Sequence, residues 1–235
     1  MIYKWLKSAQ YLIYPPTCLL CGGQGQQGRD ICEGCLRELP RNLSCCPVCA
    51  LPLPQDHGAA TTCGSCLRHH PWFDLCHAPF LYLPPLGRLI GDLKFNSGLT
   101  QARLLARLVG DSLETAMERP PELLIPIPLH PSRLRERGYN QSLELARPLS
   151  RQFGIPLQYN LCTRIRATPH QLSLKKQDRA RNVRGGFRVS GKLNARHVAL
   201  IDDVITTGAT VSELARLLKK NGVERVDVWA VARTP

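Results

Sequence analysis

The sequence has no long apolar run and no recognisable export signal. Among its 235 residues, no hydrophobic stretch approaches the roughly 18 to 20 residues that span a bilayer. The first residues also lack the apolar core and the small-residue cleavage site of a secretion signal. We therefore expect a cytoplasmic protein without a transmembrane segment.

Acidic residues are scarce in the part of the chain where basic residues gather. The whole chain has 31 Lys and Arg against 18 Asp and Glu, and residues 130–196 hold 15 Lys and Arg against three acids. Such a field attracts polyanions such as pyrophosphate or nucleic acid, and a solvated surface that serves only solubility is the alternative. Only four aromatic residues lie in that region, so base stacking is weakly signalled.

Cysteine, in contrast, is abundant, and most of the 11 cysteines form C-x-x-C pairs. Without a secretion signal this favours metal binding over disulfides, and cysteines without metal are the alternative. Two C-x-x-C turns supply the four thiolates of a structural zinc site and leave no position open for a substrate. The predicted ligands are Cys18, Cys21, Cys32 and Cys35 in one set and Cys46, Cys49, Cys63 and Cys66 in the other.

The ligand assignment has open alternatives. Cys45 precedes Cys46 and could replace it, and His57 could compete for the second site. Interleaved pairing of the four turns, and one ion rather than two, are also compatible with the sequence. A segment this short and this poor in large apolar residues needs a metal ion to fold.

Residues 198–210, VALIDDVITTGAT, predict a buried parallel strand, a turn and the start of a helix. Backbone N–H groups and hydroxyls at a helix N-terminus favour an anion such as phosphate. Asp202 and Asp203 stand just before the turn, where carboxylates accept hydrogen bonds from sugar hydroxyls or hold a hydrated Mg²⁺. A phosphorylated ribose is the predicted ligand, and a solvated turn with two acids is the alternative.

Two basic segments stand near this motif in the predicted fold. ELLIPIPLH predicts a strand that runs into a loop bearing His130, Arg133, Arg135 and Arg137, which we expect to bind pyrophosphate unless they are ordinary surface charges. Residues 158–166 and the sequence GGFRV predict two further strands. The polar and basic residues within and between these strands are predicted either to form a mobile cover over a bound anion or to line a nucleic-acid binding surface. They are Arg164, Arg166, His170, Lys175, Lys176, Arg179, Arg181 and Asn182.

Four stretches together resemble the ComF family, also called the GntX-like group: LKF, PIPLHPSRLRERGYNQS, TPHQLSLKKQDRARNV and the DD-x-x-TTG loop. The resemblance implies an α/β, type I phosphoribosyltransferase fold, with a mostly parallel sheet flanked by helices, behind a small double zinc ribbon. We expect an N-terminal amphipathic helix over residues 1–16, which docks onto the protein or lies on a membrane. The zinc-ribbon module would cover residues 17–72 and the phosphoribosyltransferase-like domain residues 73–235.

By that resemblance, Asp202 and Asp203 would be the catalytic carboxylates that face the ribose hydroxyls of phosphoribosyl pyrophosphate (PRPP), bound with Mg²⁺. Its 5′-phosphate would be wrapped by Thr206, Thr207, Gly208, Ala209 and Thr210. The family also implies a role in DNA uptake and utilisation, with single-stranded DNA and the uptake machinery as partners. It implies no acceptor base.

Three functions are compatible with these features. The first is a protein that binds PRPP or a related ligand together with single-stranded DNA. The second is an active transferase that moves ribose 5-phosphate from PRPP to a base, with the barrier lowered by positioning and by stabilising a cationic ribosyl centre. The third is a purely structural zinc adaptor, which would leave the acidic loop unused.

Overall fold

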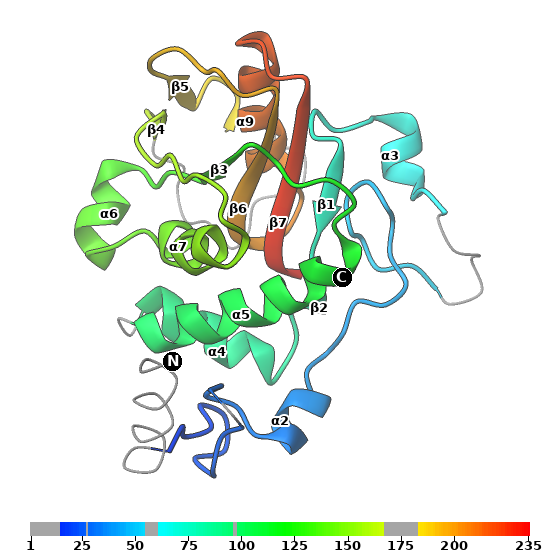
Figure 1. Cartoon of the computed structure of the whole chain (residues 1–235). Helices are drawn as coiled ribbons and strands as arrows, with labels where there is room; N and C mark the ends of the chain where they lie inside the picture. The colour runs from blue at the N-terminus through cyan, green and yellow to red at the C-terminus, as the bar shows by residue number, and fades with distance from the viewer. Residues whose placement is uncertain (1–14, 27, 55–60, 96–97, 167–182) are drawn as a thin grey trace.

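The computed structural model describes residues 15–26, 28–54, 61–95, 98–166 and 183–235 (Figure 1). Its centre is a parallel sheet of five strands. The two longest strands are buried almost throughout, because a parallel sheet covered on both faces has no solvent-facing side. The strands are β1 (Leu75–His77), β2 (Phe80–Leu81), β3 (Leu123–Pro126), β6 (His197–Ile205) and β7 (Arg225–Arg233).

The strand order is β1-β7-β6-β3, and β2 also pairs with β7 beyond the end of β1. Ala78 and Pro79 separate β1 from β2. The strand that carries the two acids lies beside the last strand, since β6 and β7 pair along their whole length.

Helices cover both faces of the sheet, and alternate residues of β6 pack against different helices. Ala199 and Ile201 lie in one core cluster with the helices that follow β2 and β3, whereas Val198 and Leu200 lie in another with the last helix. The helices are α4 (Leu86–Phe95), α5 (Leu99–Ala116), α6 (Pro131–Arg137), α7 (Gln141–Phe153) and α9 (Ala209–Lys220).

A second, antiparallel sheet joins β4 (Cys162–Arg164) to β5 (Phe187–Val189), apart from the main sheet. The strand expected over residues 158–166 is thus shorter than predicted. The N-terminal cysteine-rich region contributes two short helices, α2 (Glu33–Arg37) and α3 (Gly64–Arg68). None of the helices in the described ranges is both long and apolar enough to cross a membrane. The helix expected over residues 1–16 lies almost wholly outside the described residues.

Candidate functional site: an acidic pair beside a helix N-terminus

The carboxyl end of β6 forms a small hollow together with residues 206–210, which we name the phosphate loop after the ligand predicted for it. Gly208 has φ of +75°, a left-handed conformation that glycine adopts without strain, and α9 begins at the next residue. The hollow contains about 210 Å³, including space open to solvent, and Asp202 lines it together with the phosphate loop. The structure thus brings one acid and the loop to the same place.

Asp202 and Asp203 are adjacent but have different surroundings. Asp202 is partly exposed and accepts a hydrogen bond from Ser142 Oγ at 3.1 Å. Asp203 is 4% exposed, and its Oδ2 lies 2.8 Å from Lys94 Nζ. Its Oδ1 accepts the backbone N–H of Val204 at 2.9 Å. Asp202 is therefore the carboxylate available to a ligand, and Asp203 is held by Lys94.

These surroundings shift the pKa values of the charged groups. Burial and the neighbouring charge of Asp203 raise the pKa of Asp202 to about 8, although the backbone N–H of Asp203 and the charge of Lys94 oppose the rise. Burial alone would lower the pKa of Lys94, but the charge and hydrogen bond of Asp203 raise it. Lys94 is consequently charged, and a cation that binds Asp202 must displace a proton below about pH 8.

The predicted pyrophosphate residues are on a helix, α6, and not on the loop that the sequence analysis expected. His130 caps this helix and accepts the N–H of Ser132, and Gly138 ends it with φ of +79°. Residues four apart share a helix face, so Arg133 and Arg137 lie together and both are partly buried, whereas Arg135 is exposed. The helix therefore separates the four predicted residues onto different sides.

Arg164 on the small sheet connects the inner face of α6 with the acidic pair. Burial lowers the pKa of Arg164, the nearby charge of Arg133 lowers it further, and Asp202 opposes both effects. Arg164 thus lies close enough to interact with both Arg133 and Asp202. The Arg137 guanidinium lies 5.4 Å from the ring centroid of Phe95, the last residue of α4. This arrangement places the Arg164 guanidinium between Asp202 and the charge of Arg133 on α6.

The remaining basic residues divide between the small sheet and the part of the chain that is not described. Arg164 lies over the Phe187 ring, and Arg166 is exposed and donates to the carbonyl of Arg184 at 3.3 Å. The predicted contacts that lie outside the described residues are His170, Lys175, Lys176, Arg179, Arg181 and Asn182.

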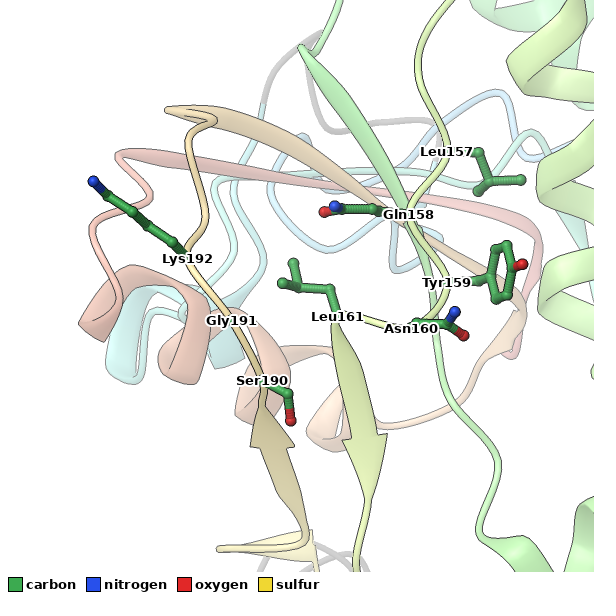
Figure 2. Close-up of a pocket in the computed structure, with 8 residues that line it drawn as sticks. All are labelled: Leu157, Gln158, Tyr159, Asn160, Leu161, Ser190, Gly191 and Lys192. Carbon is green, nitrogen blue, oxygen red and sulfur yellow. The ribbon is translucent and has the colours of Figure 1, made fainter.

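A larger hollow of about 600 Å³, again including space open to solvent, lies between residues 157–161 and 190–192. Figure 2 shows Gln158 and Leu161 pointing into it, whereas Lys192 and Tyr159 point away. It contains neither acid and no residue of the phosphate loop. Its size alone therefore does not make it the functional site.

Sequence reasoning missed three residues that shape the site. Lys94 was visible only as part of LKF, and Ser142 as part of GYNQS. Arg233, near the phosphate loop, is 5% exposed and donates to the carbonyls of Ile205 and Thr206. An Arg directly after the apolar run of residues 228–232 was the available signal for the last of these.

The two cysteine sets are assembled as the spacing predicts. Within each set the four Sγ atoms lie within 4.8 Å of one another. Cys21 and Cys32 have their sulfurs 3.7 Å apart, as do Cys49 and Cys63. Zinc–sulfur bonds of about 2.3 Å in a tetrahedron separate the sulfurs by about 3.8 Å, so both sets fit Zn²⁺. The pairing of turns is sequential and not interleaved.

Hydrogen bonds that stabilise the thiolate form support zinc binding. They also show which of the adjacent residues Cys45 and Cys46 is the ligand. Burial raises the pKa of Cys46, but backbone N–H groups, including that of Cys63, lower it to about 7. Cys45 lies outside the set, and burial raises the pKa of its thiol. Cys46 is therefore the ligand. All four positions in each set are cysteine, which makes the zinc structural.

Comparison with known proteins agrees with this architecture. Residues 9–67 match the double zinc ribbon domain family, and residues 140–235 match the phosphoribosyl transferase domain family. The chain is 37% identical to competence protein F of Haemophilus influenzae over 92% of its own length and 96% of that protein. It is 36% identical to the DNA utilization protein YhgH of Escherichia coli K12, over 95% and 99% of the two chains. It is 26% identical to competence protein ComFC of Bacillus subtilis, over 89% and 91%.

Proposed function

Because this chain belongs to the family of competence protein F and DNA utilization protein YhgH, we propose that it binds a phosphorylated ribose and single-stranded DNA during DNA utilisation. PRPP is the ligand we favour. The observation that carries the proposal is the shared hollow, in which Asp202 stands beside the phosphate loop at the N-terminus of α9. Backbone N–H groups there suit the 5′-phosphate, and the carboxylate suits the ribose hydroxyls.

The site offers complementary partners for the rest of PRPP. Arg133 on the inner face of α6 suits a pyrophosphate oxygen, because a guanidinium binds phosphate in a bidentate manner. Mg²⁺ would be held by the pyrophosphate and by Asp202, and oxygen ligands of this kind are those it prefers. Ser142 orients Asp202 and Lys94 orients Asp203.

Calorimetry with PRPP and Mg²⁺ tests the ribose-phosphate part of the proposal. We expect the double variant Asp202→Asn, Asp203→Asn to lose measurable affinity. Asp111→Asn is the matched control, because it removes an acid from α5 that pairs with Arg29 and Arg107 and is absent from the hollow. Equal affinity in the wild type and the double variant would exclude this site.

DNA binding is supported by the small sheet beside the site. Its two strands and their flanks expose Arg166, Arg184 and Arg188, and Arg188 pairs across the sheet with Thr163. These side chains stand on a chain segment that carries most of the net positive charge. A flexible polyanion that follows these arginines would have its sugar-phosphate groups close to Arg164 and Asp202.

The salt dependence of oligonucleotide binding tests this second part. Each lost phosphate contact to a single strand lowers the slope of log affinity against log salt by about 0.7, so Arg166→Glu with Arg188→Glu lowers it by about 1.4. Arg88→Glu, an exposed arginine on α4, is the control and leaves the slope unchanged. An unchanged slope in the double variant would exclude the small sheet as the DNA contact.

An active transferase is the alternative, and the intact Asp202-Asp203 pair in a phosphoribosyl transferase domain favours it. In that reaction the bond from ribose C1 to the pyrophosphate oxygen breaks, and a bond from C1 to a base nitrogen forms. Arg133 and Mg²⁺ would stabilise the leaving pyrophosphate. Release of pyrophosphate with any common base would support turnover, and its absence across all of them would leave binding alone.

A further inference from the structure

Arg233 joins two parts of the protein that the proposed function treats separately. It is the last residue of β7 and its side chain is 5% exposed. Its Nε donates to the carbonyl of Cys49 at 3.1 Å, and its Nη1 donates to the carbonyl of Ile205 at 2.9 Å and to that of Thr206. Cys49 belongs to the second cysteine set, and Thr206 begins the phosphate loop.

The guanidinium is held by carbonyl groups. Within the described ranges no carboxylate lies within ion-pair distance of Arg233. A buried charge without such a partner is costly unless every donor is satisfied, so the positions of these carbonyls and of the guanidinium depend on one another. Lysine could not replace it, because a single ammonium lacks the fixed fork that reaches carbonyls on both sides.

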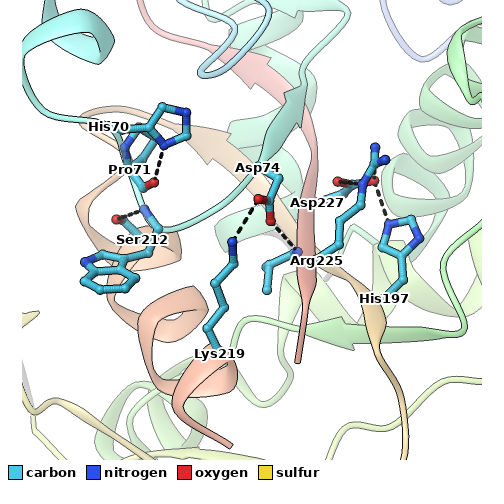
Figure 3. A network of polar contacts seen from close by, with 10 residues as sticks. His70, Pro71, Asp74, His197, Ser212, Lys219, Arg225 and Asp227 are labelled. Atoms are coloured by element: carbon cyan, nitrogen blue, oxygen red, sulfur yellow. Dashed lines mark hydrogen bonds and ion pairs between the residues drawn. The ribbon is translucent and has the colours of Figure 1, made fainter. Parts of the chain in front are cut away.

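The chain that leaves the second cysteine set contacts the phosphate loop at another point. A Cβ placed on Gly208 would stand 3.7 Å from the Phe73 ring, so this ring packs against the loop. The backbone N–H of Trp72 donates to Ser212 Oγ at 3.1 Å in the first turn of α9 (Figure 3). Residues that follow the second set in the chain therefore touch both the loop and the helix that follows it.

The first cysteine set has different neighbours. Its Cys18, together with Ile31 and Leu39, belongs to the core cluster formed by α4, α5 and α7. The described contacts of Arg233 include none of its residues. The two sets thus provide an internal comparison, since only the second is linked to the phosphate loop through Arg233.

We propose that Arg233 is a positioning residue that couples zinc in the second cysteine set to the shape of the phosphate loop. Loss of that zinc releases the carbonyl of Cys49, and the guanidinium then no longer holds the carbonyls of Ile205 and Thr206 in place. Binding of phosphorylated ribose therefore depends on the metal state of the second set. This inference rests on the proposed function for its ligand, but the coupling itself can be measured without one.

The experiment compares Arg233→Met and Arg233→Lys with Arg225→Met. Arg225 lies at the other end of β7 and pairs with Asp227 at 2.9 Å, so its removal perturbs the same strand away from the loop (Figure 3). Three quantities are measured: affinity for ribose 5-phosphate by calorimetry, amide hydrogen exchange over residues 204–212, and the rate at which a chelator removes zinc.

We expect Arg233→Met to weaken ribose 5-phosphate binding about tenfold or more, the scale for losing charge-assisted hydrogen bonds. It should also speed exchange in the loop and zinc loss from one of the two sites. Arg233→Lys should recover little of this, and Arg225→Met should show none of it. Unchanged exchange and zinc release in Arg233→Met would overturn the coupling.

Removal of a zinc ligand tests the coupling from the other side. Cys66→Ser should weaken ribose 5-phosphate binding far more than Cys32→Ser, and adding Arg233→Met to Cys66→Ser should cost little more, because both changes break one connection. Equal effects of the two cysteine variants would refute the inference. If the wild type fails to bind ribose 5-phosphate, the proposed function fails, and exchange and zinc release still decide the coupling.

Discussion

The ion pair between Lys94 and Asp203 should be one of the most sensitive contacts in the protein. The two groups lie 2.8 Å apart, with side chains 21% and 6% exposed. Lys94→Met would leave the Asp203 carboxylate buried without the cation that balances its charge, although its Oδ1 keeps the backbone N–H of Val204. Removing one member of a buried pair costs about 3–5 kcal/mol, and we discount this to about 2–4 kcal/mol because Lys94 keeps some contact with water.

Urea denaturation followed by circular dichroism, with zinc present, measures this cost. With a slope of about 3 kcal/mol per molar urea, a loss of about 3 kcal/mol moves the midpoint down by about 1 M. Lys219→Met is the matched control, because Lys219 also lies 2.8 Å from a carboxylate, that of Asp74, but the two side chains are 26% and 37% exposed. Such an exposed pair should cost less than about 1 kcal/mol.

The double variant Lys94→Met, Asp203→Asn identifies the cause of the loss. The amide that replaces the carboxylate is neutral and can keep the hydrogen bond to the Val204 N–H, so we expect the double variant to be more stable than Lys94→Met alone. The reasoning is refuted if Lys94→Met costs no more than Lys219→Met, or if the two changes at 94 and 203 simply add. Either result would mean that the carboxylate is better solvated than the structure indicates.

Four further predictions concern the site and the metal sets. The raised pKa of Asp202 means that the free protein holds a proton that the ligand must displace, so affinity for Mg²⁺ and PRPP should rise from pH 6 to pH 8 and then level. Because this pKa is higher in the folded protein than in the unfolded chain, the free wild type should lose stability relative to Asp202→Asn as the pH rises toward 8. Denaturation curves of both proteins at each pH measure this difference. Cys46→Ser should lower zinc content from two ions per chain to one, whereas Cys45→Ser should leave two by elemental analysis. Arg133→Gln should weaken pyrophosphate binding about tenfold in calorimetry, and Arg135→Gln should change it less than twofold, because Arg133 is partly buried beside Arg164, which interacts with Asp202, whereas Arg135 is exposed.

The elements that carry a strong local signal were predictable from the sequence. The β6 strand, its glycine turn and α9 follow from an apolar run, a residue suited to positive φ and a helical pattern. The C-x-x-C spacings predicted both metal sets, because four thiolates satisfy one ion locally. The small helix α6 was also predictable: Pro131 at its first position and Gly138 after its end are start and stop signals that were interpreted as a loop.

The pairing of side chains across the fold was not predictable in the same way. Nothing within LKF indicates that the last turn of α4 meets the end of β6, so the partner of Lys94 depends on tertiary packing. Arg233 bonds to backbone carbonyls, which every residue carries and which leave no trace in the sequence. The different exposure and different partners of Asp202 and Asp203 were not predictable for the same reason, because they depend on the residues that pack beside each acid.

The position of β7 in the sheet has a consequence for the order in which the protein can fold during synthesis. Leu75 of β1 pairs with Asp227, and Phe80 of β2 pairs with Ala232, so the earliest strands find their partner only after most of the chain has left the ribosome. The cysteine turns, in contrast, need only nearby residues and can capture metal first. The cysteine-rich region would then bind metal before β7 pairs with β1 and β2. Such long-range strand pairing is slow.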